Sequence, residues 1–379
     1  MWNIGLFLVL GLAANCHAQS VASQCLQDLD AIPGFLLAND TGAKDHLAKF
    51  GQRHFDDALA LARNSASQAT TSDACDTAIR QYLQAWRHGH LELQPLGPQA
   101  GKPGTATARK RDDTPTLAVL SAKTLVLTLK SFRDANRDPL VALIKKNHGA
   151  LASHRNWIID VRGNGGGSDS SYTPLLPWLM TDEMVDVGQE MLATPDNITG
   201  WERFCDILSP GDNVCKAFED RGIARMRKAA PGQYVPQDDD GRITFERLKG
   251  LEPRRPTRVA ILIDHGCGSS CEELVLAARQ SFQVKLIGRS TYGSLDYSNV
   301  RPHELPSGQR RLWYATTRSN RIPDLPVDLS GIQPDIYLPM DPNNPQAKDD
   351  EVKRVQNWLE GGSIGPLKAG PIGISVIAR

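Results

Sequence analysis

Two adjacent serines stand in a segment whose pattern suits an activated nucleophile. The apolar run Val259–Ile263 predicts a buried strand, Gly266 and Gly268 permit a tight turn after it, and Ser269 and Ser270 precede a helical stretch. Such a turn exposes a hydroxyl and places helix amides and the positive end of the helix dipole beside it. Serine also caps helices well, and on this segment alone a helix cap is the simpler interpretation.

A second glycine-rich turn follows another predicted buried strand. The run Trp157–Val161 is apolar apart from Asp160, and the turn extends from Gly163 to Gly167. Consecutive glycine amides can point at a developing oxyanion or cradle a phosphate. No Gly-Lys-Ser/Thr follows, so the segment is not a P-loop. The turn is a candidate oxyanion-binding loop.

Three motifs taken together resemble the C-terminal processing (tail-specific) protease family. Asp160–Gly167 is similar to its Asp-x-Arg-Gly-Asn-x-Gly-Gly loop, and Ser269–Glu272, with the turn Gly288–Gly293 behind it, is similar to its nucleophile segment. Gly331–Ile336 is similar to its late Gly-Val-x-Pro-Asp-Ile motif. The motifs occur in the family's order, and the resemblance implies a crotonase-like or ClpP-like α/β core with a protein or peptide as substrate.

The position that carries the catalytic base in the common branch of that family differs here. A lysine after the Thr-x-Gly turn activates the serine in that branch, and this sequence has Ser294 there. The tricorn-like branch uses a histidine with a carboxylate behind it. Resemblance to that branch assigns His90 as the base and Asp328 as the acid that orients it, with His88 as the alternative base.

The resemblance also implies a mechanism. Ser269 attacks the scissile carbonyl while the histidine transfers the proton, and the family's Ser-x-x-Glu register favours Ser269 over the alternative nucleophile Ser270. No cofactor or metal is expected. The amide of Ser270 and that of Gly166 or Gly167 are expected to bind the oxyanion.

The missing lysine supports a second hypothesis, a non-catalytic binding protein for a lipophilic ligand or a peptide on the same fold. An esterase of the α/β-hydrolase type is disfavoured, because the Gly-x-Ser-x-Gly elbow is absent. Lys+Arg and Asp+Glu both number 43, so no global field attracts nucleic acid or an anionic membrane. The sequence makes no prediction of the oligomeric state.

Helical and strand patterns divide the chain into segments. Helical periodicity runs from Val21 to Arg87, a Gly- and Pro-rich linker from Leu96 to Pro115, and strands alternate with helices after it, which predicts an α/β core with a small N-terminal helical domain. The expected organisation is a signal peptide (1–18), the helical domain (19–92), the catalytic core (93–340, with an insertion at 195–255) and a C-terminal helical tail (341–379).

The N-terminus predicts export to the periplasm or the medium. The apolar run Ile4–Ala14 is too short for a permanent membrane span, and Cys16-His17-Ala18 resembles a cleavage site. The mature chain would begin near Gln19 and carry no integral span.

Six cysteines remain after that cleavage, and an even count in an exported protein suggests disulfides. Cys25–Cys75 and Cys205–Cys215 are the natural pairs by position, whereas Cys267 and Cys271 either form a bridge across a turn or remain free thiols. No CxxC spacing accompanies them, so a zinc site is not expected.

Overall fold

The computed structural model describes residues 20–96 and 112–365, except 182, 209, 239–242 and 249. The predicted signal peptide, most of the predicted linker and the last part of the predicted tail, from 366, lie outside the described residues. No helix within the described ranges is both long and apolar enough to cross a membrane.

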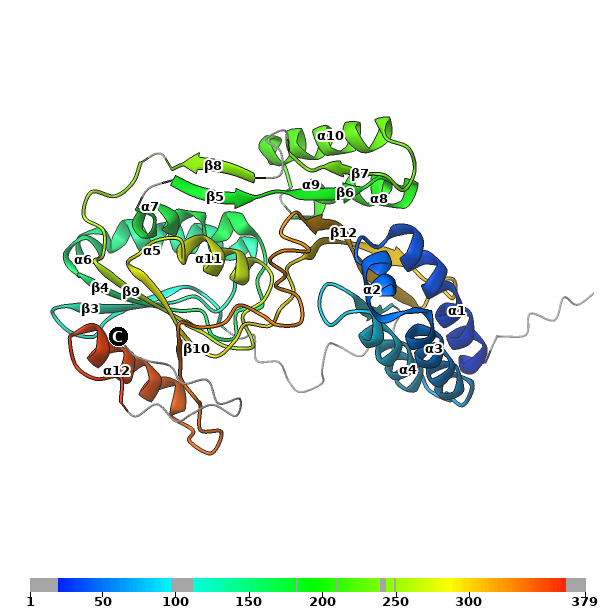
Figure 1. The fold of residues 1–379 in the computed structure, drawn as a ribbon, viewed down its shortest axis with the longest axis horizontal. Helices are drawn as coiled ribbons and strands as arrows, with labels where there is room; N and C mark the ends of the chain where they lie inside the picture. The colour runs from blue at the N-terminus through cyan, green and yellow to red at the C-terminus, as the bar shows by residue number, and fades with distance from the viewer. Residues whose placement is uncertain are drawn as a thin grey trace, which may run out of the picture.

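Four helices at the N-terminus pack against one another at one end of the molecule (Figure 1). They are α1 (Val21–Asn39), α2 (Ala43–Phe50), α3 (Gln52–Ser67) and α4 (Ser72–Trp86). A disulfide between Cys25 and Cys75 joins α1 to α4, and the rings of Phe55 and Trp86 stack 4.0 Å apart between α3 and α4. Because α4 ends at Trp86, this packing also fixes where the segment with His90 begins.

A six-stranded sheet forms the centre of the α/β core, in the order β13-β10-β9-β4-β3-β2. All neighbours pair in parallel except β2 and β3. The central strands are almost wholly apolar because helices cover both faces of the sheet. The strands are β2 (Thr116–Val119), β3 (Thr124–Thr128), β4 (Asn156–Asp160), β9 (Arg258–Ile263), β10 (Val284–Gly288) and β13 (Ile336–Tyr337).

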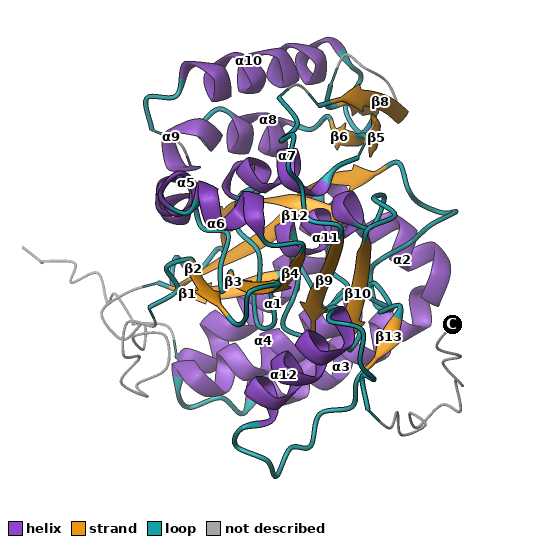
Figure 2. Cartoon of the chain, turned by 90° about the vertical axis from the view of Figure 1, so that its left-hand side faces the viewer, coloured by secondary structure: helices purple, strands orange, loops and turns teal. Residues whose placement is uncertain are grey.

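Figure 2 shows helices on both sides of this sheet. One face packs on short helical segments and on α11 (Ser270–Ala278), and the other packs on α12 (Ala347–Leu359). Buried Glu351 of α12 contacts Arg162, 2.5 Å away, and Arg289, so α12 is tied to the glycine-rich turn after β4. The remaining segments on the first face are η1 (Asp134–Asn136), α5 (Arg137–Lys146), α6 (His148–Ser153), η2 (Asp169–Ser171), η3 (Thr173–Leu175) and α7 (Leu176–Leu179).

A second, antiparallel sheet connects the N-terminal helices, the core and the region after residue 188. Its long strand β12 pairs with β11 on one edge and with β1 and β6 on the other. Strand β7 pairs with the far edge of β6. One strand therefore sets the relative position of three parts of the chain. The strands are β1 (Glu92–Pro95), β6 (Gln189–Leu192), β7 (Tyr234–Pro236), β11 (Tyr297–Glu304) and β12 (Arg310–Ser319).

Residues 195–255 form helices α8 (Pro195–Trp201), α9 (Phe204–Leu208) and α10 (Asn213–Lys228), then β7 and β8 (Ile243–Arg247). Strand β8 pairs with β5 (Glu183–Val187) in a separate two-stranded ribbon. A disulfide between Cys205 and Cys215 links α9 to α10. We call α8, α9 and α10 the cap, because they lie beside β6 and β7 at the edge of the second sheet (Figure 1).

Candidate active site

The turn between β9 and α11 holds Ser269 in an unusual backbone conformation. Its φ is 56° and its ψ is −127°, which residues with a side chain rarely adopt and which is typical of functional turns. Cys267 and Cys271, both fully buried, form a disulfide across the turn, which answers the question that the sequence left open. The turn is thus constrained covalently on both sides of the serine.

Buried Glu272 ties this turn to the next one. Its carboxylate accepts hydrogen bonds from the amides of Ser269 (3.1 Å), Gly293 (2.8 Å) and Ser294 (2.9 Å) and from the hydroxyl of Thr291. Burial raises the pKa of Glu272, and these four hydrogen bonds oppose the rise. The sequence signal was a glutamate three residues after a serine, the pattern of a capping box. Glu272 is therefore a residue of the site that sequence reasoning missed.

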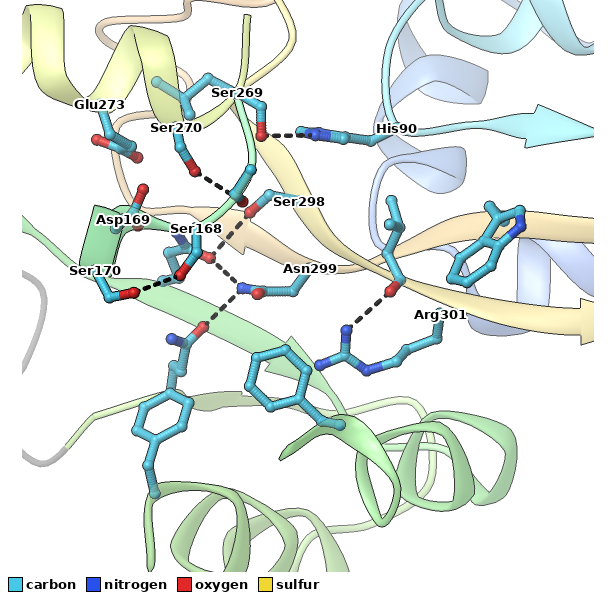
Figure 3. A pocket seen from close by; sticks show the side chains of 18 of the residues that line it. His90, Ser168, Asp169, Ser170, Ser269, Ser270, Glu273, Ser298, Asn299 and Arg301 are labelled. Atoms are coloured by element: carbon cyan, nitrogen blue, oxygen red, sulfur yellow. Dashed lines mark hydrogen bonds between the residues drawn. The ribbon is translucent and has the colours of Figure 1, made fainter. Parts of the chain in front are cut away.

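His90 lies opposite the nucleophile turn (Figure 3), with its Nε2 3.1 Å from the Oγ of Ser269. Its Nδ1 is 2.6 Å from the backbone carbonyl oxygen of Tyr297. A carbonyl oxygen only accepts, so Nδ1 carries the proton and the lone pair of Nε2 faces the serine hydroxyl. This tautomer is the one that can take a proton from Ser269.

The turn that carries His90 is held by buried Arg87. Its guanidinium forms two hydrogen bonds with the carboxylate of Asp40, at 2.8 and 2.7 Å, and donates to the carbonyls of Gly89 (2.8 Å) and His90 (3.1 Å). Asp40 also accepts from the amide of Ala315 on β12. These contacts support a positive φ of 54° at His90. Sequence reasoning missed Arg87 and Asp40, because they lie 47 positions apart and no pattern in the sequence indicates that they pair.

A close approach to Ser294 explains the glycine that precedes His90. A Cβ atom placed on Gly89 would lie 2.1 Å from the Cβ of Ser294, so position 89 accepts only glycine and the His90 turn packs directly on Ser294. The position that carries a lysine in the common branch of the family therefore lies beside the turn that presents the histidine.

Asp328 does not contact the imidazole, contrary to our expectation. Its Oδ1 accepts from the amides of Leu295 (2.6 Å) and Asp296 (2.7 Å), and Asp296 in turn accepts from the amide of Asp328. The carbonyl of the next residue, Tyr297, occupies the place at Nδ1 of His90 that we had given to the carboxylate. Asp328 thus acts on the segment that presents this carbonyl. Its other oxygen is buried without a hydrogen-bond partner among the described residues.

The backbone amides expected to bind the oxyanion differ in whether they already have a hydrogen-bond acceptor. The amide of Gly166 donates to the side chain of Asn164 (2.9 Å), so of the two alternative glycines it is the one already engaged. The amides of Gly167 and Ser270 make no hydrogen bond within the described part of the chain. The Ser270 hydroxyl donates to the carbonyl of Gly167 (3.0 Å), which directs it to the glycine-rich turn, whereas the Ser269 hydroxyl faces His90.

The alternative base lies outside this arrangement. His88 is exposed, and its carbonyl accepts from the hydroxyl of Tyr292 at 3.2 Å. The imidazole that meets the serine belongs to His90.

His90 and Ser269 line a cavity of about 430 Å³ (Figure 3). Asp169 and Glu273 line it near the glycine-rich turn, and Arg301 lines it on the side of the cap. Burial raises the pKa of Glu273, which the nearby Arg321 opposes. No group of histidine, cysteine and acidic residues in the described ranges is arranged to hold a metal ion.

A serine hydroxyl on a strained strand-to-helix turn, an imidazole with its acceptor nitrogen on that hydroxyl, and free amides beside it define the class of serine hydrolases. The sequence profile of Peptidase family S41 matches residues 123–338, more than half of the chain. The chain belongs to this family and is a serine peptidase. The resemblance in the sequence is thereby confirmed.

Solved structures with the same fold are distant in sequence. Mature CPAF in complex with lactacystin superposes with a TM-score of 0.61 at 10% identity, covering 90% of this chain and 97% of that chain. A candidate peptidase from Parabacteroides merdae superposes with a TM-score of 0.53 at 14% identity, covering 94% and 100%. No curated protein matches the sequence significantly. The likeness confirms the α/β fold with a small N-terminal helical region.

The surroundings of His90 predict that the reactivity of Ser269 falls at low pH. Burial lowers the pKa of His90 below its usual 6.5, the Tyr297 carbonyl opposes this and Arg87 adds to it. The imidazole is neutral, and able to accept a proton, above that lowered pKa. We expect the rate of labelling of the serine by a fluorophosphonate to rise through a pKa below 6.5 and to be level at neutral pH. A midpoint at or above 6.5 would contradict the buried setting.

Proposed function

We propose that the chain is an exported serine peptidase that cleaves peptide bonds through an acyl-enzyme formed on Ser269. The observation that carries the proposal is the 3.1 Å contact between Nε2 of His90 and Oγ of Ser269. Such a contact allows the imidazole to remove the hydroxyl proton as the oxygen attacks the scissile carbonyl.

The remaining steps follow from the neighbouring groups. The amides of Ser270 and Gly167 donate to the oxyanion of the tetrahedral intermediate, where preorganised donors stabilise developing charge. His90 then gives its proton to the leaving amine, and water, activated by the same imidazole, hydrolyses the acyl-enzyme. No cofactor or metal takes part in these steps.

The imidazole is oriented by a neutral group in this proposal. The Tyr297 carbonyl holds Nδ1–H and stabilises the imidazolium less than a carboxylate would. Asp328 is a positioning residue, because it binds the amides of Leu295 and Asp296, immediately before Tyr297.

Export is supported by the N-terminal sequence and by the three disulfides. Disulfides persist in oxidising compartments such as the periplasm and the medium. In the mature protein, residues 19–92 would act as a helical domain that supplies His90, and residues 93–340 as the core that supplies Ser269.

Replacement of the nucleophile tests the assignment of Ser269. We expect a fluorophosphonate probe to label the wild type, and Ser269→Ala to lower peptide hydrolysis by about 10⁶-fold or to the detection limit. Ser270→Ala is the matched control: it keeps the backbone amide, so labelling should persist. Labelling that survives in Ser269→Ala would move the nucleophile to Ser270, and a wild type that is never labelled would favour the binding protein.

The role of Asp328 is tested by two substitutions at one position. Asp328→Asn keeps an oxygen that accepts from the two amides, so we expect kcat/KM to fall less than about tenfold. Asp328→Ala removes the acceptor and should cost more, because the Tyr297 carbonyl is released. An orienting acid in direct contact would instead make the asparagine variant about 10⁴-fold slower.

The start of the mature chain tests export. When the full chain is expressed in a bacterium, we expect protein recovered from the periplasm or medium to begin near Gln19 by N-terminal sequencing. Protein found only in the cytosol with Met1 or Trp2 at its end would contradict export.

A further inference from the structure

Arg301 of β11 is a buried cation on the wall of the cavity that contains Ser269. The residue is 4% exposed, and its Cζ lies 4.3 Å from the ring of Trp201 and 4.2 Å from the ring of Phe204. Nη1 donates to the carbonyl of Val300 at 2.8 Å. Nε and Nη2 are buried and have no hydrogen-bond partner among the described residues.

This isolation distinguishes Arg301 from the other buried arginines of the described chain. Each of those contacts at least one carboxylate: they are Arg87 with Asp40, Arg162 with Asp160 and Glu351, and Arg310 with Asp28 and Asp76. The carboxylate of Glu219 interacts electrostatically with Arg301. It already accepts a hydrogen bond from the amide of Cys205 and pairs with Lys216. Burial lowers the pKa of Arg301 to about 9, so the guanidinium is charged at neutral pH.

Two stacked rings do not replace a counter-ion. Aromatic faces attract a guanidinium, but a buried charge remains costly unless its N–H groups are also paired. The two free nitrogens, Nε and Nη2, form the edge of the guanidinium that a carboxylate binds with two parallel hydrogen bonds. The missing partner of Arg301 therefore has the chemistry of a carboxylate.

The cavity has opposite charges in different places. Arg301 extends from β11 into the pocket on the side of the cap, whereas Asp169 and Glu273 lie across it near Ser270 (Figure 3). Glu273 pairs with Arg321 at 3.3 Å, whereas Arg301 pairs with no carboxylate among the described residues, so the positive charge that lacks a partner lies beneath the cap. A carboxylate of a bound peptide is thus attracted to that end of the cavity.

We propose that Arg301 is a specificity residue that binds a carboxylate of the peptide substrate, either an Asp or Glu side chain or the chain terminus. The inference rests on the proposed function, because it assigns the substrate class of the same cavity. Phe204 of α9 lines the cavity and stacks on the guanidinium. Because Nε and Nη2 are buried, neighbouring groups must shift for a carboxylate to reach them.

Binding to an inactive protein tests this without relying on catalysis. Fluorescein-labelled peptides with blocked ends, identical except for Glu or Gln at one position, are titrated into full-length Ser269→Ala and followed by anisotropy. We expect the glutamate peptides to bind roughly 10 to 100 times more tightly at one position, in line with hydrogen bonds to a charged group. A second pair of peptides contains no acidic residue, and its members end in a free carboxylate or in an amide. A preference within this pair assigns the bound carboxylate to the chain terminus and not to a side chain.

Substitution of Arg301 assigns the effect to this residue. Arg301→Met keeps the length and suits the aromatic surroundings, and it should abolish the preference for the carboxylate while leaving binding of the glutamine or amide peptide unchanged. Arg311→Met is the control, since Arg311 pairs with Glu304 and does not line the cavity. The preference should survive in that variant.

The outcomes separate this inference from the proposed function. Equal binding of both members of every pair to Ser269→Ala overturns the role of Arg301, even if wild-type Ser269 is labelled normally. Weakening of charged and neutral peptides alike in Arg301→Met, in a protein that still reacts with the fluorophosphonate when Ser269 is present, assigns Arg301 to packing only. A wild type that is never labelled but whose Ser269→Ala variant prefers carboxylates refutes the peptidase mechanism and leaves the binding site.

Discussion

The hydrogen bond between His90 and Ser269 joins two groups that are 179 positions apart in the chain, and the rest of the structure serves to bring them together. The imidazole follows the last N-terminal helix, whereas the hydroxyl lies at the end of a central strand. Strand β12 connects the two parts, because it pairs with β1 just after His90 and binds the junction of α1 and α2 through Thr41 and Asp40. Docking of the helices is thus a condition of the contact between His90 and Ser269.

Both partners of this hydrogen bond sit in strained backbone. A positive φ at a residue with a side chain costs of order 1–3 kcal/mol and persists only where the surroundings enforce it. At His90 the enforcing group is Arg87, which binds two carbonyls of the turn, and at Ser269 it is Glu272 together with the disulfide across the turn. Each strained residue is therefore held by a buried charged group that has its own partners.

The charges around the site are placed at a distance from the reacting atoms. A backbone carbonyl contacts the imidazole where a carboxylate was expected, and burial together with Arg87 keeps the imidazole neutral. The carboxylate of Asp328 supports the segment of that carbonyl instead. Arg301, on the wall of the cavity, is a buried charge whose Nε and Nη2 have no hydrogen-bond partner among the described residues.

The sequence by itself predicted the α/β core, because strand periodicity and glycine turns are local properties of the chain. Through the resemblance of its motifs it also predicted the nucleophile turn and His90. It did not determine which group contacts Nδ1 of His90, since a backbone carbonyl has no signature in the sequence. The positions of Arg87 and Asp40 were equally invisible, because their pairing depends on how α4 docks beside β12. The cysteine bridge across the nucleophile turn and the lack of a partner at Arg301 were also decided only by tertiary structure, since pairing is a matter of distance in space.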